Sequence, residues 1–122
     1  MIKNDELTEK IIGACYEVHG ELGPGFNEKI YKNALKIVLK KKGLKFVEEK
    51  VFPLIFQNNK IGEFRIDLIV ESKVIVELKA VNGIMPKVFE SQVISYLKAA
   101  GFKVGLLINF GNQNCNVRRL LN

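Results

Sequence analysis

Apolar residues recur at helical spacing in the first third of the chain. The segment 7–22 places apolar side chains three or four residues apart, which predicts an amphipathic helix. Gly23-Pro24-Gly25 then interrupts the chain. A second apolar stripe predicts a helix over about 26–42, with Gly43 as its natural stop. The apolar positions of the two helices are Leu7, Ile11, Cys15, Val18 and Leu22, then Ile30, Ala34, Leu35, Val38 and Leu39.

A composition typical of strands replaces the helical pattern after Gly43. The segment 44–56 is rich in β-branched and aromatic residues, and Pro53 within it indicates an edge strand or a bulge. The segments 61–70 and 74–80 predict two further strands around a short turn at Glu71-Ser72-Lys73. We expect these three strands to form a meander.

The last third of the chain predicts another helix and another strand. Asn82-Gly83 breaks the chain, and Pro86 suits the first turn of a helix that runs to about Ala100. The nearly continuous apolar stretch 102–110 predicts a buried strand, and the tail is expected to hold a short helix or strand. A strand-helix-strand crossover makes the last pair parallel. The predicted order α-α-β-β-β-α-β therefore gives one α/β domain over residues 1–122, with a mixed central β-sheet flanked by helices.

Two neighbouring strands of this predicted sheet carry a polar stripe. Side chains along a strand alternate between faces. If Glu71-Ser72-Lys73 is a three-residue loop, Asp67 lies opposite Glu77, and Arg65 lies opposite Lys79. A one-residue slip would mix polar and apolar side chains on both faces, so the apolar face selects this register. On that face the predicted pairs are Val70 with Val74, Leu68 with Val76, and Ile66 with Leu78.

Two carboxylates that face each other require compensation. Like charges directly opposite each other destabilise a sheet, and a divalent cation compensates them because hard cations take carboxylate oxygens. Lys79 lies on the same predicted face as Glu77, where an ammonium group can stabilise a phosphoryl transition state beside an activated water. The alternative is a solvated face, in which a two-residue shift pairs Asp67 with Lys79 as an ordinary exposed ion pair.

Composition narrows the class of protein. The formal net charge of +6 suits a polyanionic partner. No apolar run approaches about 18 residues, so we expect no membrane span, and the first six residues lack the apolar stretch of a secretory signal. Cys15 and Cys115 lack the spacing of a zinc site. A cytoplasmic protein with two reduced thiols is therefore expected.

Three short motifs resemble the PD-(D/E)XK nuclease superfamily. Asp67, followed after nine residues by Glu77-Leu78-Lys79, resembles the D…(D/E)-x-K core of that superfamily. The segment 25–31 reads G-x-x-E-x-x-Y, the signature of its GxxExxY family, and the segment 92–96 resembles the Q-x-x-x-Y helix motif of its exonuclease branch. Ile66 departs from the pattern, which has proline before the aspartate, but that proline is not a ligand.

The resemblance implies a restriction-endonuclease-like core that holds a divalent metal. Asp67 and Glu77 would bind Mg²⁺ or Mn²⁺, with the Leu78 carbonyl as a further ligand. Lys79 would orient the attacking water or neutralise the phosphate. Glu28 would be an additional acid that reaches the metal directly or through water. The alternative role for Glu28 is a glutamate that interacts with the helix dipole.

The resemblance also implies four candidates for substrate contact. Gln92 and Tyr96 lie four residues apart on one helix face and would contact a phosphate or a base. Alternatively, Tyr96 belongs to the core and Gln92 is exposed. Tyr31 shares a helix face with Glu28 and either touches the substrate or packs. Arg65 either holds a phosphate or merely flanks the site.

The implied function is hydrolysis of nucleic-acid phosphodiester bonds, with DNA as the expected substrate. One alternative is a catalytically silent nuclease-like domain that binds nucleic acid or another protein. Another is a dimerisation domain, with Pro53 and the first-strand edge as the contacts of a homodimer. Loss of Mn²⁺-dependent cleavage in Asp67→Ala, with the fold intact, would support the enzyme. The sequence leaves open DNA versus RNA, endo- versus exonuclease action, and any sequence preference.

Overall fold

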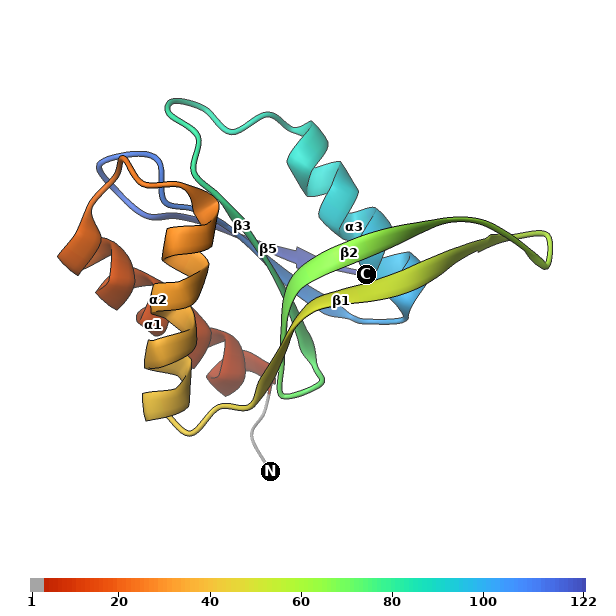
Figure 1. The fold of residues 1–122 in the computed structure, drawn as a ribbon, viewed down its shortest axis with the longest axis horizontal. Coiled ribbons are helices and arrows are strands. Elements are labelled where there is room, and N and C mark those ends of the chain that lie inside the picture. Colours follow the sequence, from red (N-terminus) through yellow and green to blue (C-terminus); the bar gives the residue numbers. More distant parts are fainter. Residues whose placement is uncertain (1–3) are drawn as a thin grey trace.

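The computed structural model describes residues 4–122. Residues 1–3, part of the stretch expected to lack a secretory signal, lie outside the described residues. The elements, shown in Figure 1, are α1 (Asn4–Leu22), α2 (Glu28–Lys41), β1 (Phe46–Phe56), β2 (Asn59–Val70), β3 (Val74–Lys79), α3 (Val88–Ala100), β4 (Val104–Asn109) and β5 (Asn116–Leu121). The predicted order is confirmed, and the tail contributes the final strand. The third helix begins at Val88, after Pro86 rather than at it.

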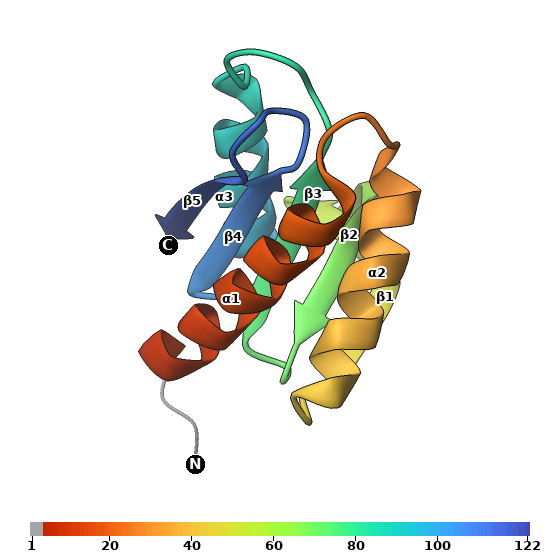
Figure 2. The same cartoon turned by 90° about the vertical axis from the view of Figure 1, so that its left-hand side faces the viewer.

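The strands form one mixed sheet in the order β1-β2-β3-β4-β5. The β3–β4 pair is parallel, as the crossover through α3 predicts, and the other neighbouring pairs are antiparallel. Figure 2 shows α1 and α2 in front of the sheet and α3 behind it. The α/β class, with a mixed sheet flanked by helices, is therefore confirmed. Pro53 lies in an edge strand whose register shifts between Leu54 and Ile55.

Two apolar cores lie on opposite faces of the sheet. The first joins α1 and α2 to one face, where fully buried helical side chains pack on strand residues: Leu7, Ile11, Cys15, Tyr31, Leu35 and Leu39 on Leu68, Val70, Val76, Leu78 and Leu106. The second joins α3 to the other face through Ile66, Ile69, Ile75, Val93, Leu97 and Leu107. Burial of these side chains supplies the main stabilisation of both layers.

The loop between β2 and β3 has the predicted register at its base. Val70 pairs with Val74, and the next two pairs also follow the prediction, ending at Leu68 with Val76. The ladder stops there. The predicted pairs of Asp67 with Glu77 and of Arg65 with Lys79 do not form, because β2 separates from β3 at this point. The separation opens the sheet where the candidate acids lie.

The prediction that Ile66 shares a face with Leu68 is wrong. Leu68 packs in the first core and Ile66 in the second. The same change occurs in β1, where Phe46 packs against the first core and Phe52 against the second. Between them, Glu49 adopts a positive φ of 55°. The β1–β2 ribbon therefore exchanges its faces near Glu49 and Asp67, and Figure 1 shows its far half extending past α3.

Among the described residues, no helix is long and apolar enough to cross a membrane. Cys15 is buried, Cys115 is partly buried, and neither forms a disulfide. Burial raises the pKa of both thiols, to about 11 for Cys115, so both favour the unreactive protonated form.

Candidate active site

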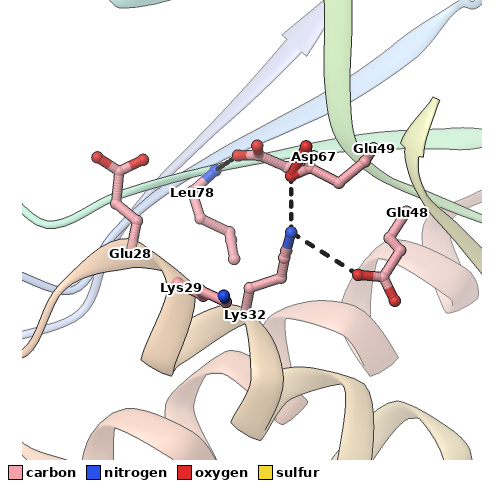
Figure 3. Close-up of a pocket in the computed structure, with 7 residues that line it drawn as sticks. All are labelled: Glu28, Lys29, Lys32, Glu48, Glu49, Asp67 and Leu78. Atoms are coloured by element: carbon pink, nitrogen blue, oxygen red, sulfur yellow. Dashed lines mark hydrogen bonds and ion pairs between the residues drawn. The ribbon is translucent and has the colours of Figure 1, made fainter. Parts of the chain in front are cut away.

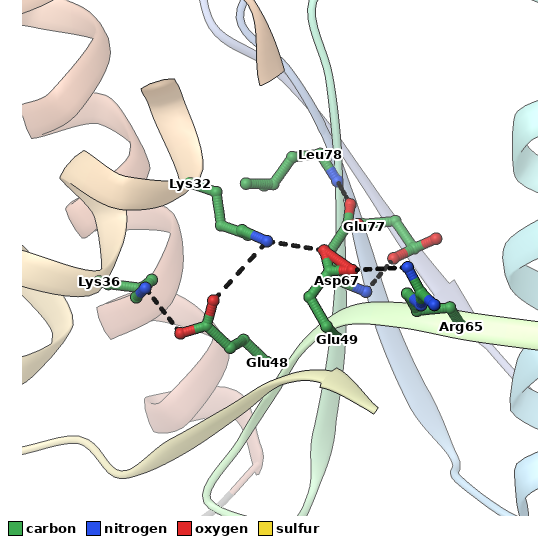
Figure 4. A network of polar contacts seen from close by, with 8 residues as sticks. All are labelled: Lys32, Lys36, Glu48, Glu49, Arg65, Asp67, Glu77 and Leu78. Carbon is green, nitrogen blue, oxygen red and sulfur yellow. Dashed lines mark hydrogen bonds and ion pairs between the residues drawn. The ribbon is translucent and has the colours of Figure 1, made fainter. Parts of the chain in front are cut away.

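Asp67 and Glu77 meet where β2 separates from β3. The Asp67 backbone N–H donates a hydrogen bond to Glu77 Oε2 at 2.7 Å. In return, the Leu78 backbone N–H donates to Asp67 Oδ2 at 2.9 Å. Figure 4 shows both contacts. Each carboxylate thus accepts a backbone N–H of the opposite strand and leaves its second oxygen for another partner.

The electrostatics of this pair centre on Glu77, of which only 6% is exposed. Burial is the largest cause that raises its pKa to about 8, and the negative charge of Asp67 raises it further. The Asp67 backbone hydrogen bond and the Lys79 charge act in the opposite direction. The Glu77 side chain also hydrogen-bonds the Asp67 side chain, which favours the protonated form. These effects together favour the protonated form of Glu77 at neutral pH.

A cavity of about 500 Å³ opens between α2 and the sheet beside this pair. Its lining residues, drawn in Figure 3, are Glu28, Lys29, Lys32, Glu48, Glu49, Asp67 and Leu78. Four of these side chains are carboxylates and two are lysines. When all are ionised, the lining keeps two excess negative charges, the charge that one divalent cation neutralises.

Glu28 enters the cavity from the first turn of α2. The Asn27 side chain caps this helix by accepting the Ile30 backbone N–H at 3.1 Å, which fixes where the helix begins. Loss of surrounding water raises the pKa of Glu28, Lys79 lowers it, and Asp67 raises it. Glu28 and Asp67 line the same cavity, and the Lys79 charge is close enough to lower the pKa of Glu28.

Lys32 lies one helical turn after Glu28 and belongs to the cavity as well. Its Nζ lies 2.7 Å from Glu49 Oε1 and 3.8 Å from Glu48 Oε1. Burial lowers its pKa, but the Glu49 hydrogen bond and the charges of Glu49, Glu48 and Asp67 outweigh burial and raise it. The sequence analysis missed Lys32, although its spacing of four residues from Glu28 places both on one helix face.

Arg65 takes part in the same polar network rather than facing Lys79. Its Nη1 lies 3.5 Å from Glu49 Oε2, and its side chain is largely exposed (63%). Glu48 and Glu49, which bind these basic side chains (Figure 4), were also missed by the sequence analysis. No spacing links them to Asp67, because only the β1–β2 pairing brings them together.

Lys79 lies at the end of β3, close to α3. Its Nζ is 4.2 Å from the ring centre of Phe89, a cation–π contact. The chain beyond Lys79 is held by Asn109, which is fully buried. The Asn109 amide accepts the Val81 N–H at 2.9 Å and donates to the Val81 carbonyl at 3.0 Å. These contacts fix the backbone that follows the lysine.

Tyr96 and Gln92 both lie on α3. The Tyr96 ring stacks on Phe64, with ring centres 4.7 Å apart. Burial raises the Tyr96 pKa, and the charges of Glu77 and Asp67 raise it further, so the phenol lies within electrostatic reach of the acid pair. Gln92 is exposed.

Tyr31 has a structural environment. It is fully buried, its ring stacks on Phe110 with centres 4.5 Å apart, and its hydroxyl donates to the Gly23 carbonyl. The Phe26 backbone N–H donates to the same hydroxyl at 3.3 Å. Of the two roles considered for Tyr31, the structure fits packing, because no part of the side chain is exposed to a substrate.

The donor set fits a hard divalent cation. Among residues 4–122, no group of three or more His, Cys, Asp or Glu side chains is arranged so that it could hold a metal ion. Mg²⁺ usually binds through one or two carboxylates and keeps several waters and substrate oxygens. Asp67 and Glu77 are the one or two carboxylates that such a site needs, and Glu28 lines the same cavity as Asp67.

Comparisons with known proteins agree with the geometry. A family model described as the PD-(D/E)XK nuclease superfamily matches residues 5–120. The crystal structure of SSO0001 is similar to this chain with a TM-score of 0.59 and 19% identity, covering 97% of this chain. This chain spans 59% of that protein, and the likeness concerns the fold. No curated protein sequence shows significant similarity. Because the family model spans nearly the whole described fold, this chain belongs to the PD-(D/E)XK nuclease superfamily.

Proposed function

We propose that this protein is a divalent-metal-dependent nuclease that hydrolyses phosphodiester bonds of nucleic acid, with DNA as the first substrate to test. The observation that carries the proposal is the meeting of Asp67 and Glu77 at the strand separation, each held by the other strand's backbone. Such fixed hydrogen bonds orient the remaining carboxylate oxygens and reduce the reorganisation needed to bind an ion.

The residues around the pair take distinct roles in this proposal. Asp67 and Glu77 hold Mg²⁺ or Mn²⁺ together with the Leu78 carbonyl, and Glu28 completes the acidic side of the cavity. When bound, the ion acts as a Lewis acid for the phosphate and lowers the pKa of a water. Lys79 offsets the charge that develops on the phosphate.

The α3 side of the opening is assigned to the substrate. Tyr96, stacked on Phe64 and close to the acid pair, presents a partly exposed aromatic ring to a base or phosphate. Gln92, one turn earlier on the same face, offers an amide to the same substrate. Arg65 at the cavity's outer side remains a candidate phosphate contact.

The remaining features of the proposal concern the whole protein. Residues 1–122 form one nuclease-like domain in this proposal. The segment 25–31 supports the GxxExxY family as its specific family. Two unpaired thiols fit a reducing, cytoplasmic location. A homodimer through the β1 edge is the proposed assembly, and sedimentation would measure its mass.

The test compares Asp67→Asn with the wild type for Mn²⁺-dependent cleavage of labelled DNA and RNA. We expect the wild type to cleave and Asp67→Asn to lose on the order of a hundredfold or more of the rate. The matched control is Glu63→Gln, another acid of β2, which is exposed and paired with Lys60. It should keep full activity.

Two outcomes would contradict the proposal. Equal cleavage by Asp67→Asn and the wild type would remove the proposed metal site. Binding of nucleic acid by a wild type that cleaves neither DNA nor RNA would favour the catalytically silent binding module instead.

A further inference from the structure

A cleft runs along α2 from the candidate active site toward the start of β1. The cavity beside Asp67 adjoins a second cavity of about 610 Å³, and Glu48 lines both. The second cavity is lined by Lys36, Lys40, Leu44, Lys45, Phe46 and Glu48. Figure 4 shows Lys32 and Lys36 reaching from the helix toward Glu48 on β1. The two cavities therefore adjoin at Glu48, and together they are called the cleft.

One side of this cleft is a row of lysines. Lys29, Lys32, Lys36 and Lys40 follow one another at intervals of three, four and four residues, which places them on one face of α2. At 1.5 Å per residue the row spans about 16 Å, room for roughly three to five phosphates of one strand. The row begins next to Glu28 and Asp67 and ends near Lys45.

The charge of the cleft outside the metal-binding acids is positive. Its five lysines face two glutamates, Glu48 and Glu49, which leaves three excess positive charges. Lys32 and Lys36 are paired with these glutamates, at 2.7 Å to Glu49 and 2.6 Å to Glu48. The pairs hold both ammonium groups in the cleft, where phosphate oxygens can replace the carboxylates as acceptors.

Two of the five lysines, Lys32 and Lys36, are recessed, whereas Lys29, Lys40 and Lys45 are exposed. The Lys32 side chain is 12% exposed and that of Lys36 is 24% exposed. Single-stranded nucleic acid typically follows a basic groove with its backbone and stacks its bases on aromatic side chains there. The partly buried Phe46 ring lines the cleft, with Lys40 Nζ 6.0 Å from its centre. An aromatic ring in a basic groove offers a base a stacking surface.

We infer that the cleft between α2 and β1 binds a single nucleic-acid strand and leads its backbone to Asp67. The inference rests on the proposed nuclease function and specifies its substrate class: a single strand, or the single-stranded end of a duplex. Lys36 and Lys40 contact phosphates away from the reacting bond.

The experiment measures binding of a short labelled oligonucleotide, either single-stranded or duplex, by fluorescence anisotropy in the presence of Ca²⁺. A gel checks that the probe keeps its full length during the measurement. The variant is the double change Lys36→Gln with Lys40→Gln. The matched control is Lys41→Gln with Lys98→Gln, which removes the same charge from two exposed lysines outside the cleft. Each protein is titrated between about 50 and 200 mM salt, and thermal melting confirms that each is folded.

We expect the wild type and the control to prefer the single strand, and the cleft variant to bind it on the order of tenfold more weakly at low salt. The dependence of log affinity on log salt should become shallower by about 1.4 in the cleft variant, since each phosphate contact on a single strand contributes about 0.7. Equal behaviour of variant and control would overturn the inference, as would preference of the wild type for the duplex or absence of binding. The nuclease proposal is judged separately by cleavage in Asp67→Asn, so the cleft can fail while the nuclease stands.

Discussion

Glu77 holds a proton at a pH where an ordinary glutamate has lost it. Burial, and then the Asp67 charge, raise its pKa from 4.5 to about 8 in the folded protein. In the unfolded chain the pKa returns to its ordinary value. Between these two values the folded state therefore binds more protons than the unfolded state, and stability falls as the pH rises through this window.

We predict that Glu77→Gln becomes progressively more stable relative to the wild type as the pH rises from about 5 to about 8. The amide carries no titrating proton, and its oxygen can still accept the Asp67 N–H. The difference in unfolding free energy should grow by about 1 kcal/mol per pH unit and level off above a pH of about 8. Urea denaturation at a series of pH values measures it.

Glu63→Gln serves as the control, because that carboxylate is exposed and lies on the same strand as Asp67. Its difference from the wild type should stay within about 0.5 kcal/mol over the same range. A Glu77→Gln curve parallel to that of the wild type would show that Glu77 is already ionised in the folded protein.

At the scale of elements, the exchange of faces in the β1–β2 ribbon creates the site. Regular alternation would have placed Ile66 with Leu68 and Asp67 beside Ile69. Instead the ribbon turns near Glu49, where a positive φ replaces the ordinary strand conformation. The turn sends Asp67 to the cavity on the α2 side while Ile66 remains under α3.

The conformation of Glu49 predicts an unusual order of stabilities. Glu49→Gly and Glu49→Ala both lose the ion pairs to Lys32 and Arg65. Only glycine adopts a positive φ without steric cost, so Glu49→Gly should be more stable than Glu49→Ala by about 1 kcal/mol. Denaturant unfolding of the two variants measures the difference.

Val51, two residues along the same strand, provides the comparison. Val51 does not have a positive φ, so Val51→Gly should be less stable than Val51→Ala. The same order at positions 49 and 51 would contradict the assigned conformation of Glu49.

The whole molecule is a single sheet with one apolar core on each face. Leu35 belongs to the core under α1 and α2, and Phe64 packs against the core under α3. The candidate site lies where the two layers meet, so its geometry depends on both. The central strands contribute side chains to each core, which couples the two layers during unfolding.

We predict that Leu35→Ala and Phe64→Ala each lower stability by roughly 2–5 kcal/mol and that each variant still unfolds in one transition. Circular dichroism reports the backbone. Since the chain has no Trp, tyrosine emission reports Tyr31 in the first core and Tyr96 beside the second, in addition to the exposed Tyr16. Coincident curves are expected from the two probes. Separate transitions in Phe64→Ala would show that the layer under α3 folds on its own.

Much of this architecture follows from local pattern. The order of elements is encoded by apolar periodicity and by breakers such as Gly43 and Gly101, which end α2 and α3 with positive φ values. The first pairs of the β2–β3 hairpin follow from its three-residue loop and its apolar face. These features depend on residues close together along the chain.

The candidate site contains residues that could be predicted from the sequence and residues that only the fold brings there. The motif spacing selected Asp67, Glu77, Lys79 and Glu28 from the sequence. In the fold, Asp67 and Glu77 each accept a backbone N–H of the other's strand, and Glu28 lines the same cavity as Asp67. Lys32 could have been predicted from its spacing of four residues from Glu28 on the same helix. Glu48 and Glu49 could not have been predicted, because their place beside Asp67 depends on strand pairing between distant segments.

The sequence by itself determined which elements form, in what order, and which acids are candidates, because helical and strand periodicities are local properties of a chain. Only the tertiary structure decided where β2 leaves β3, which face each half of the β1–β2 ribbon covers, and that Tyr31 is buried. Those outcomes depend on contacts between segments that lie far apart in the chain. The two halves of the β1–β2 ribbon pack against different cores, so the side chains that face each core change between the halves, which no local pattern encodes.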